Sequence, residues 1–263
     1  LMAWGNNYMG LSTVPQLPSG RTYTDFSVTT DHSVALLSDG SAVCWGFNYP
    51  GYQLPVLPSG VTFTKAYANY QTNAWLRSDG LACLSNGWYF PSPPTGMTYV
   101  DVASSQGWGV ALRSDGELVS LTPQYWSSYY YSPPPLPWGV SYVEMVGSDL
   151  LITARRSDGR LVAFGDPLGY GAEDIPQAES GTSYIQITAG FSTFAGILGP
   201  TTTYTSYAHG CAGSLPAARL VPRNTPFVGE PLEVRVFDLP SSTAVMLTGF
   251  QESSHWRAET QRY

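Results

Sequence analysis

Few residues in this 263-residue chain have the types and spacing that catalysis or metal binding requires. The histidines are His32, His209 and His255, and no Cys-x-x-Cys or His-x-x-x-His pattern accompanies them. His32 lies where a loop enters a strand, so we expect a structural turn histidine. The chain has no glycine-rich phosphate loop and no Gly-x-Ser-x-Gly motif. The sequence therefore predicts a protein that is not an enzyme and holds neither a metal ion nor another cofactor.

Four aspartates recur in the sequence Ser-Asp-Gly, at Asp39, Asp79, Asp115 and Asp158. An aspartate at the start of a tight turn accepts a hydrogen bond from the backbone two residues further on. We therefore interpret these carboxylates as turn formers and not as a catalytic pair.

Aromatic residues are the best candidates for molecular recognition, because Tyr and Trp offer a large contact area, a polar atom and few rotatable bonds. They gather in two sets of loops. The first set follows the first strand of a repeated unit and holds Tyr70, Trp108 and Phe191. The second set follows the third strand and holds Tyr8, Tyr49, Trp88, Tyr89, Tyr125, Trp126, Tyr129, Tyr130 and Tyr170.

Each set has a structural alternative. Trp108 aligns with His32 at a strand entry, so its ring could belong to the core. The second set could pack over proline-rich outer segments. The run Tyr129 to Tyr131 favours exposure, because consecutive side chains of an extended segment point to opposite faces.

The elements that position these loops come from an internal repeat. Glycine followed three residues later by an aromatic residue occurs five times in register with the repeat, beginning at Gly20, Gly60, Gly96, Gly139 and Gly181. In the first four units Ser-Asp-Gly ends 20 residues after that glycine, and in the fifth Leu198-Gly199-Pro200 replaces it. A fixed internal spacing repeated at about 40 residues is typical of propellers and solenoids.

Within a unit the pattern predicts three strands and a proline-limited connector. In the first unit these strands are Tyr23–Thr29, Ser33–Leu37 and Ser41–Trp45, and the last two form a hairpin across Ser38-Asp39-Gly40. Proline in segments such as Val14–Leu17 makes each an edge strand or a connector. We predict an all-β propeller of about five blades, because a solenoid would need capping ends that the sequence does not show.

The first unit carries a family resemblance, through Trp4-Gly5-Asn6-Asn7, Ser38-Asp39-Gly40 and Val43-Cys44-Trp45-Gly46. It resembles the short-repeat branch of the regulator-of-chromosome-condensation propellers, and within it the secreted bacterial propellers that inhibit β-lactamases. In those inhibitors the loop after the first strand of each blade carries aromatic contacts. The matching positions here hold no aromatic residue, which argues against β-lactamase inhibition; they are Asp31, Gln71, Gly107, Leu150 and Ser192.

The resemblance also bears on how the ring closes. Family members usually have seven blades and pair an N-terminal strand with the last blade. Leu1–Trp4 matches such a strand and could complete the fifth unit, although Thr203–Ala208 could take the same place. The alternative to a closed five-bladed ring is a fragment of a larger propeller.

The repeat stops near residue 201, so we assign residues 1–201 to the propeller and 202–263 to a C-terminal module. Alternation at Leu232, Val234 and Val236 and the apolar run Val245–Leu247 predict an incomplete β-sandwich-like segment of about three strands. Such a segment could mediate self-association. Cys44 and Cys83 lie in strand-like runs and are expected to be buried thiols, while Cys211 lies in a loop and could pair outside this chain.

Composition excludes some functions. The net charge is −7 and Lys65 is the only lysine, so a nucleic-acid partner is not expected. No apolar run reaches 18 residues, so membrane insertion is not expected either. We expect a secreted or cell-surface protein that binds a protein partner through aromatic loops on one rim. Carbohydrate binding and a role as a structural or assembly subunit are the alternatives.

Overall fold

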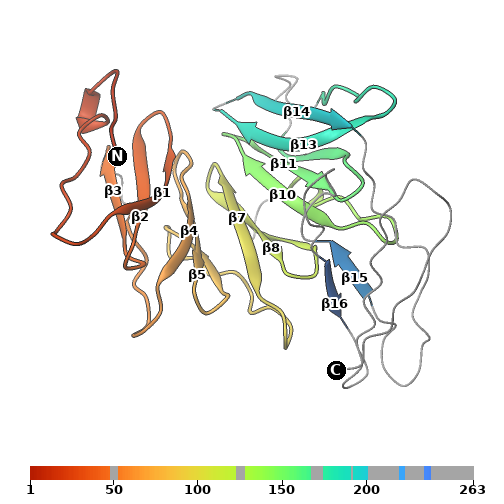
Figure 1. Cartoon of the computed structure of the whole chain (residues 1–263), viewed down its shortest axis with the longest axis horizontal. Coiled ribbons are helices and arrows are strands. Elements are labelled where there is room, and N and C mark those ends of the chain that lie inside the picture. Colours follow the sequence, from red (N-terminus) through yellow and green to blue (C-terminus); the bar gives the residue numbers. More distant parts are fainter. Residues whose placement is uncertain are drawn as a thin grey trace.

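The chain folds into a succession of small antiparallel sheets (Figure 1). The computed structural model describes residues 1–47, 53–122, 128–166, 174–190 and 192–200, and two short strands at 219–222 and 234–237. The first sheet contains β1 (Tyr23–Val28), β2 (His32–Leu37) and β3 (Ala42–Gly46). The second contains β4 (Phe63–Tyr67), β5 (Ala74–Arg77) and β6 (Ala82–Leu84). The third contains β7 (Tyr99–Ser105), β8 (Trp108–Arg113) and β9 (Leu118–Leu121).

The fourth sheet has the same order, and the fifth has two strands among the described residues. The fourth contains β10 (Tyr142–Gly147), β11 (Leu151–Arg156) and β12 (Leu161–Gly165). The fifth contains β13 (Thr182–Ala189) and β14 (Phe194–Pro200). Two short helices, η1 (Tyr8–Gly10) and α1 (Ser128–Tyr131), lie in connections. The predicted strands of the first unit are confirmed, and Val14–Leu17 is a connector without strand pairing.

The Ser-Asp-Gly sequence forms the turn between the second and third strands, and it does so in a way that joins two sheets. Asp39 Oδ1 accepts a hydrogen bond from the backbone N–H of Ser41 at 3.0 Å, as predicted for a turn aspartate. The Gly80 carbonyl accepts a bond from the N–H of Tyr99, the first residue of the next sheet, at 2.8 Å. The other turns repeat this bond to the aromatic residue of the following unit, which links the two sequence markers physically.

The same aromatic residue holds the proline-rich connector of its own unit. The Tyr99 hydroxyl donates to the carbonyl of Pro91, eight residues earlier, at 2.7 Å. Tyr23, Tyr142 and Tyr184 donate in the same way to Pro15, Pro134 and Pro176. A carbonyl of a proline-rich segment has no sheet partner, so this bond fixes a connector that cannot join the sheet itself.

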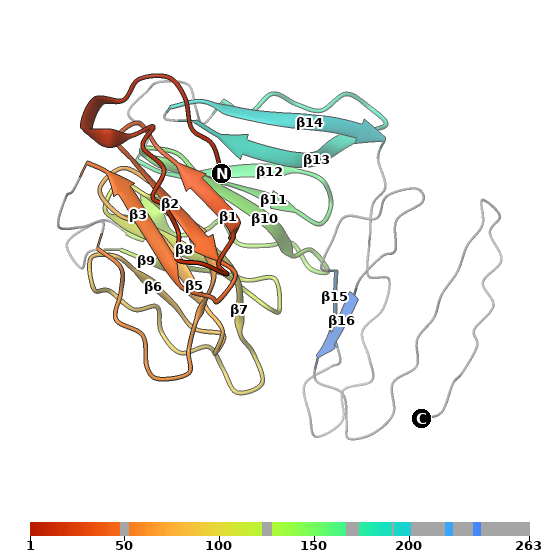
Figure 2. The ribbon, with the colours of Figure 1, turned by 60° about the vertical axis from the view of Figure 1, so that its left-hand side comes forward.

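The core lies between successive sheets, face to face. One cluster joins Val34 and Leu36 of the first sheet to Phe63 and Trp75 of the second. Two further clusters repeat this packing between the second and third sheets and between the third and fourth. The first strands β1, β4, β7, β10 and β13 contact one another in sequence. Figure 2 shows β13 and β14 beside the sheet of β10, β11 and β12. This is the arrangement of propeller blades around a hub.

The expectation that Leu1–Trp4 forms a strand is wrong. Residues 1–7 form no strand and lie against the first sheet, beside Phe26 and Val28. Met2 is 84% and Trp4 is 89% exposed, so burial provides no energy to draw the segment into a sheet. The number of blades in the complete ring therefore stays a prediction.

In the C-terminal region the predicted strand around Val234 and Val236 is present as β16 (Val234–Phe237), which pairs antiparallel with β15 (Arg219–Pro222). The run Val245–Leu247, the alternative strand Thr203–Ala208 and Cys211 lie outside the described residues. The domain boundary near residue 201 stays a prediction. Among the described residues no helix is long and apolar enough to cross a membrane.

Candidate functional site

His32 has a structural place, as expected. Its side chain is buried, its Nδ1 lies 2.9 Å from Asp31 Oδ1, and its Nε2 lies 2.7 Å from Asn73 Oδ1 in the second sheet. The ring thus ties two neighbouring blades together with side-chain partners. Within the described part of the chain no group of three or more His, Cys, Asp or Glu residues could hold a metal ion.

The two described cysteines lie in surroundings that disfavour ionisation of their thiols. Cys83 is buried and Cys44 is half-buried, and both are free thiols. Burial raises the pKa of Cys44 to about 12 and that of Cys83 to about 11. A thiol must lose its proton to act as a nucleophile, so burial disfavours the reactive form of both residues.

The described parts of both sets of aromatic loops lie at one end of the sheets. In three antiparallel strands, the loop after the first strand and the segment after the third strand emerge at the same end. The backbone shows this directly, because the N–H of Phe47, after β3, donates to the carbonyl of Asp31, between β1 and β2, at 2.7 Å. We call this end the loop face. It is formed by residues 29–31, 47, 69–73, 85–89, 106–107, 148–150 and 190, together with η1, which contacts β3 and is followed by Leu11 beside Gly46 at the end of that strand.

The candidate aromatic residues divide between this face and the core. Tyr8, Tyr70, Tyr89 and Tyr130 are exposed, and Phe47, which was not among the predicted residues, is exposed as well. Trp88 is half-buried against the core of the second and third sheets. Trp108 is 1% exposed, so of its two alternatives the core position holds. Its ring packs edge-on against Tyr131, with ring centroids 5.1 Å apart.

Tyr49, Tyr125, Trp126, Tyr170 and Phe191 lie outside the described residues, as does the side chain of Tyr129. Their role in binding therefore stays a prediction.

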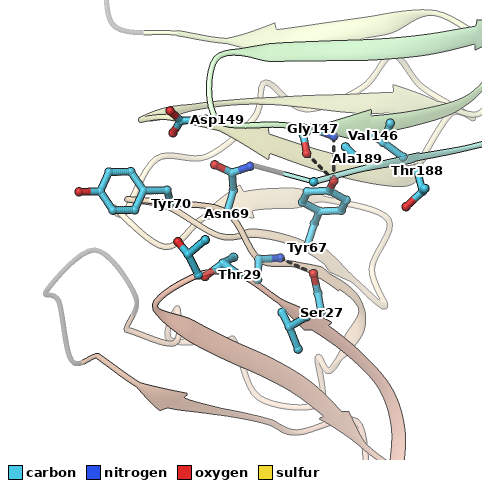
Figure 3. A pocket seen from close by; sticks show the side chains of 14 residues that line it. Ser27, Thr29, Tyr67, Asn69, Tyr70, Val146, Gly147, Asp149, Thr188 and Ala189 are labelled. Atoms are coloured by element: carbon cyan, nitrogen blue, oxygen red, sulfur yellow. Dashed lines mark hydrogen bonds between the residues drawn. The ribbon is translucent and has the colours of Figure 1, made fainter. Parts of the chain in front are cut away.

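A pocket of about 450 Å³ opens at the loop face, where four units meet around the hub (Figure 3). Its lining comes from the ends of the first strands and from the loops that follow them. Thr29 represents the first unit, Asn69 and Tyr70 the second, Asp149 the fourth and Thr188 the fifth. A volume of this size is within the usual range for a site that holds one small group.

Tyr67 closes the floor of this pocket by joining units that are not neighbours in sequence. Its hydroxyl donates to the carbonyl of Gly147 at 2.7 Å and accepts from the N–H of Gly147 at 2.8 Å. Burial raises the pKa of Tyr67 to about 12, so the hydroxyl keeps the proton that it donates. Close by, Asn69 Nδ2 donates to the carbonyl of Ser148 at 2.9 Å. The second and fourth units therefore meet across the hub.

Two residues that line the pocket each carry a buried side-chain oxygen without a protein donor among the described residues, namely Asn69 Oδ1 and Asp149 Oδ1. Burial raises the pKa of Asp149 above its ordinary value. Neither residue was predicted from the sequence, although the loop positions Gln71 and Leu150 lie close to them in the chain. The sequence does show a polar residue in each of these two loops. Only the fold shows that the two loops line one pocket.

Comparisons with known proteins agree with this geometry. The family model described as "Regulator of chromosome condensation (RCC1) repeat" matches residues 23–51. A comparison with curated proteins gives no significant match. Among solved structures, the CRINKLY WD40 ectodomain of the Arabidopsis thaliana receptor kinase ACR4 has a TM-score of 0.51 at 15% identity, over 74% of this chain and 66% of that one. The fold is a β-propeller.

Two further structures support this conclusion. Human WBSCR16 has a TM-score of 0.53 at 12% identity, over 75% of this chain and 66% of that chain. Yeast RCC1 (Prp20), in a structure with Kap60, has a TM-score of 0.52 at 13% identity, over 72% and 56%. This chain spans between about half and two thirds of the length of such propellers. The family-model match and the yeast structure are similarities to RCC1-type repeats, and the specific likeness to bacterial β-lactamase inhibitors is not confirmed.

Proposed function

We propose that this chain is a non-catalytic module that binds a protein partner through its loop face. The observation that carries the proposal is the presence there of exposed aromatic side chains from separate units, including Tyr8, Phe47, Tyr70 and Tyr89. Such residues supply most of the affinity in protein interfaces, because they bury a large area with little loss of side-chain entropy. Their placement on loops leaves the sheets to fix their positions.

The structural neighbours support the same class of function. The yeast propeller Prp20 is seen bound to Kap60, and a second structure of the same yeast protein is described together with its binding to Gsp1p and histones. One fold serves many functions, so the argument for this chain depends on its own loop face. Carbohydrate binding, self-association through the C-terminal segment and secretion remain predictions from the sequence.

An affinity capture with matched baits tests the proposal. The full chain and the double variant Tyr8→Ala/Tyr89→Ala are offered to a mixture of extracellular proteins, and captured proteins are quantified by mass spectrometry. We expect at least one protein to be depleted about tenfold or more on the variant, since loss of a central aromatic contact costs about 2 kcal/mol or more.

Trp138→Ala is the matched control. Trp138 is also exposed, but it precedes β10 and so lies at the end of the sheets opposite to the loop face. A partner lost equally on Trp138→Ala, or retained within twofold on the double variant, would contradict binding through the loop face.

A further inference from the structure

The hub pocket contains an amide whose orientation is fixed by the protein. Asn69 is 6% exposed, and its Nδ2 donates to the carbonyl of Ser148 at 2.9 Å. A carbonyl oxygen can only accept, so the nitrogen of the amide must face Ser148 and the oxygen must face the other way. Figure 3 shows the amide between the rings of Tyr67 and Tyr70, with its oxygen on the side of Asp149. No donor among the described residues reaches that oxygen.

Asp149 adds a second acceptor to the same pocket. Its Oδ1 is buried and has no protein donor within the described part of the chain. Asp149 is also the only charged side chain among the described residues that line the pocket. A buried carboxylate oxygen and a buried amide oxygen without donors are both unfavourable in the free protein. Both become favourable when a group rich in N–H donors enters.

The chemistry of the lining selects the kind of group. Two acceptors and one negative charge repel a carboxylate or a phosphate and attract a cation. Arginine presents five N–H donors in a flat fork, so one guanidinium can serve two acceptors at once, which an ammonium does less well. The ring of Tyr70 stands at the pocket and offers a face on which a guanidinium can stack (Figure 3).

We propose that the hub pocket binds the guanidinium group of an arginine side chain presented by a protein partner, with Asn69 and Asp149 as its acceptors. This inference rests on the proposed function, because it specifies what a partner would insert at the loop face. The net charge of −7 favours the approach of a basic partner segment. The pocket volume of about 450 Å³ accommodates a guanidinium with part of its aliphatic stem.

Titration calorimetry of the full chain with a short peptide tests the inference. The probe is acetyl-Gly-Arg-Gly-amide, whose caps remove the terminal charges, in about 0.15 M salt to screen non-specific attraction. Its neutral analogue carries citrulline in place of arginine, and a third peptide carries lysine. We expect the arginine peptide to bind at least about tenfold more tightly than the citrulline peptide, and more tightly than the lysine peptide.

Protein variants then locate the binding. Asp149→Asn keeps the shape of the side chain and removes its charge, and it should weaken the arginine peptide at least about tenfold. Glu179→Gln removes the same charge at an exposed position outside the pocket lining and should change affinity less than twofold. Equal binding of the arginine and citrulline peptides, or unchanged affinity in Asp149→Asn, would overturn the inference. If the arginine peptide shows no preferential binding while the Tyr8→Ala/Tyr89→Ala variant still loses its captured protein, the result contradicts the arginine pocket and leaves the proposed function supported.

Discussion

At Asp149, folding and binding make opposite demands on one carboxyl group. Burial raises the pKa of Asp149, so folding stabilises its protonated form relative to its ionised form. The stabilisation that belongs to this form is complete below the ordinary Asp pKa of about 4 and is lost as pH rises through the raised pKa. We therefore expect Asp149→Asn to be at least as stable as the parent at pH 7 in urea unfolding, with the difference vanishing near pH 3.5.

Asp39 provides a control of opposite sign. A hydrogen bond from the Ser41 side chain, 2.6 Å long, lowers the pKa of Asp39. Its stabilising effect is present above the ordinary Asp pKa and is lost as pH falls through the lowered pKa. Asp39→Asn should therefore lower stability at pH 7 and lose that effect in acid. Parallel pH dependences for the two variants would show that burial does not govern Asp149.

At the scale of the elements, the glycine of a Ser-Asp-Gly turn packs closely against the following unit. Gly80 has φ +77°, and a Cβ there would lie 2.5 Å from Thr98 Cγ2. Gly60 has φ +79° with open space around the same position. Gly60→Ala should cost about 1–2 kcal/mol of unfolding free energy from the left-handed backbone alone. Gly80→Ala should cost about 1–3 kcal/mol more, because Thr98 must move. Equal losses of stability for the two variants in thermal or urea unfolding would contradict close packing between Gly80 and Thr98.

Local patterns predicted these elements well, because the constraints are local. Alternation and Ser-Asp-Gly placed β2 and β3 of the first sheet correctly, since a tight turn and a two-residue period determine a hairpin. The constant 20-residue spacing has its cause within each sheet, where the N–H of Thr62 donates to Ser78 Oγ at 3.0 Å and the N–H of Ser78 donates to the carbonyl of Thr62 at 2.9 Å; the same pair of bonds recurs in the other units that carry Ser-Asp-Gly. The prediction of a strand at Leu1–Trp4 was wrong because a strand also needs a pairing partner, which a local sequence pattern does not identify.

At the scale of the whole molecule, the sequence leaves the neighbours of each sheet unspecified. Phe26 takes the position in β1 that Met145 takes in β10, three residues after the motif aromatic. Met145 is 3% exposed because a neighbouring sheet covers it, whereas Phe26 is 57% exposed. The same alternation of side chains thus places a residue in the core of one sheet and at the surface of another. The candidate pocket was unpredictable for the same reason, since Asn69 and Asp149 lie far apart in the chain and meet only when the second and fourth units share a hub.

The contact across that hub separates this architecture from a linear stack. In a solenoid each repeat contacts only its neighbours, and stability is nearly a sum of nearest-neighbour contributions. Here the Tyr67 hydroxyl satisfies both the N–H and the carbonyl of buried Gly147, two units away. Tyr67→Phe should therefore lower the free energy of unfolding by about 2–4 kcal/mol, because it leaves two buried backbone groups without a hydrogen-bond partner. The matched change Tyr142→Phe removes one bond, to Pro134 of its own unit, and should cost about 1 kcal/mol. Urea unfolding followed by tryptophan fluorescence measures both, and a Tyr67→Phe loss no larger than that of Tyr142→Phe would mean that the hub bridge adds nothing to the ring.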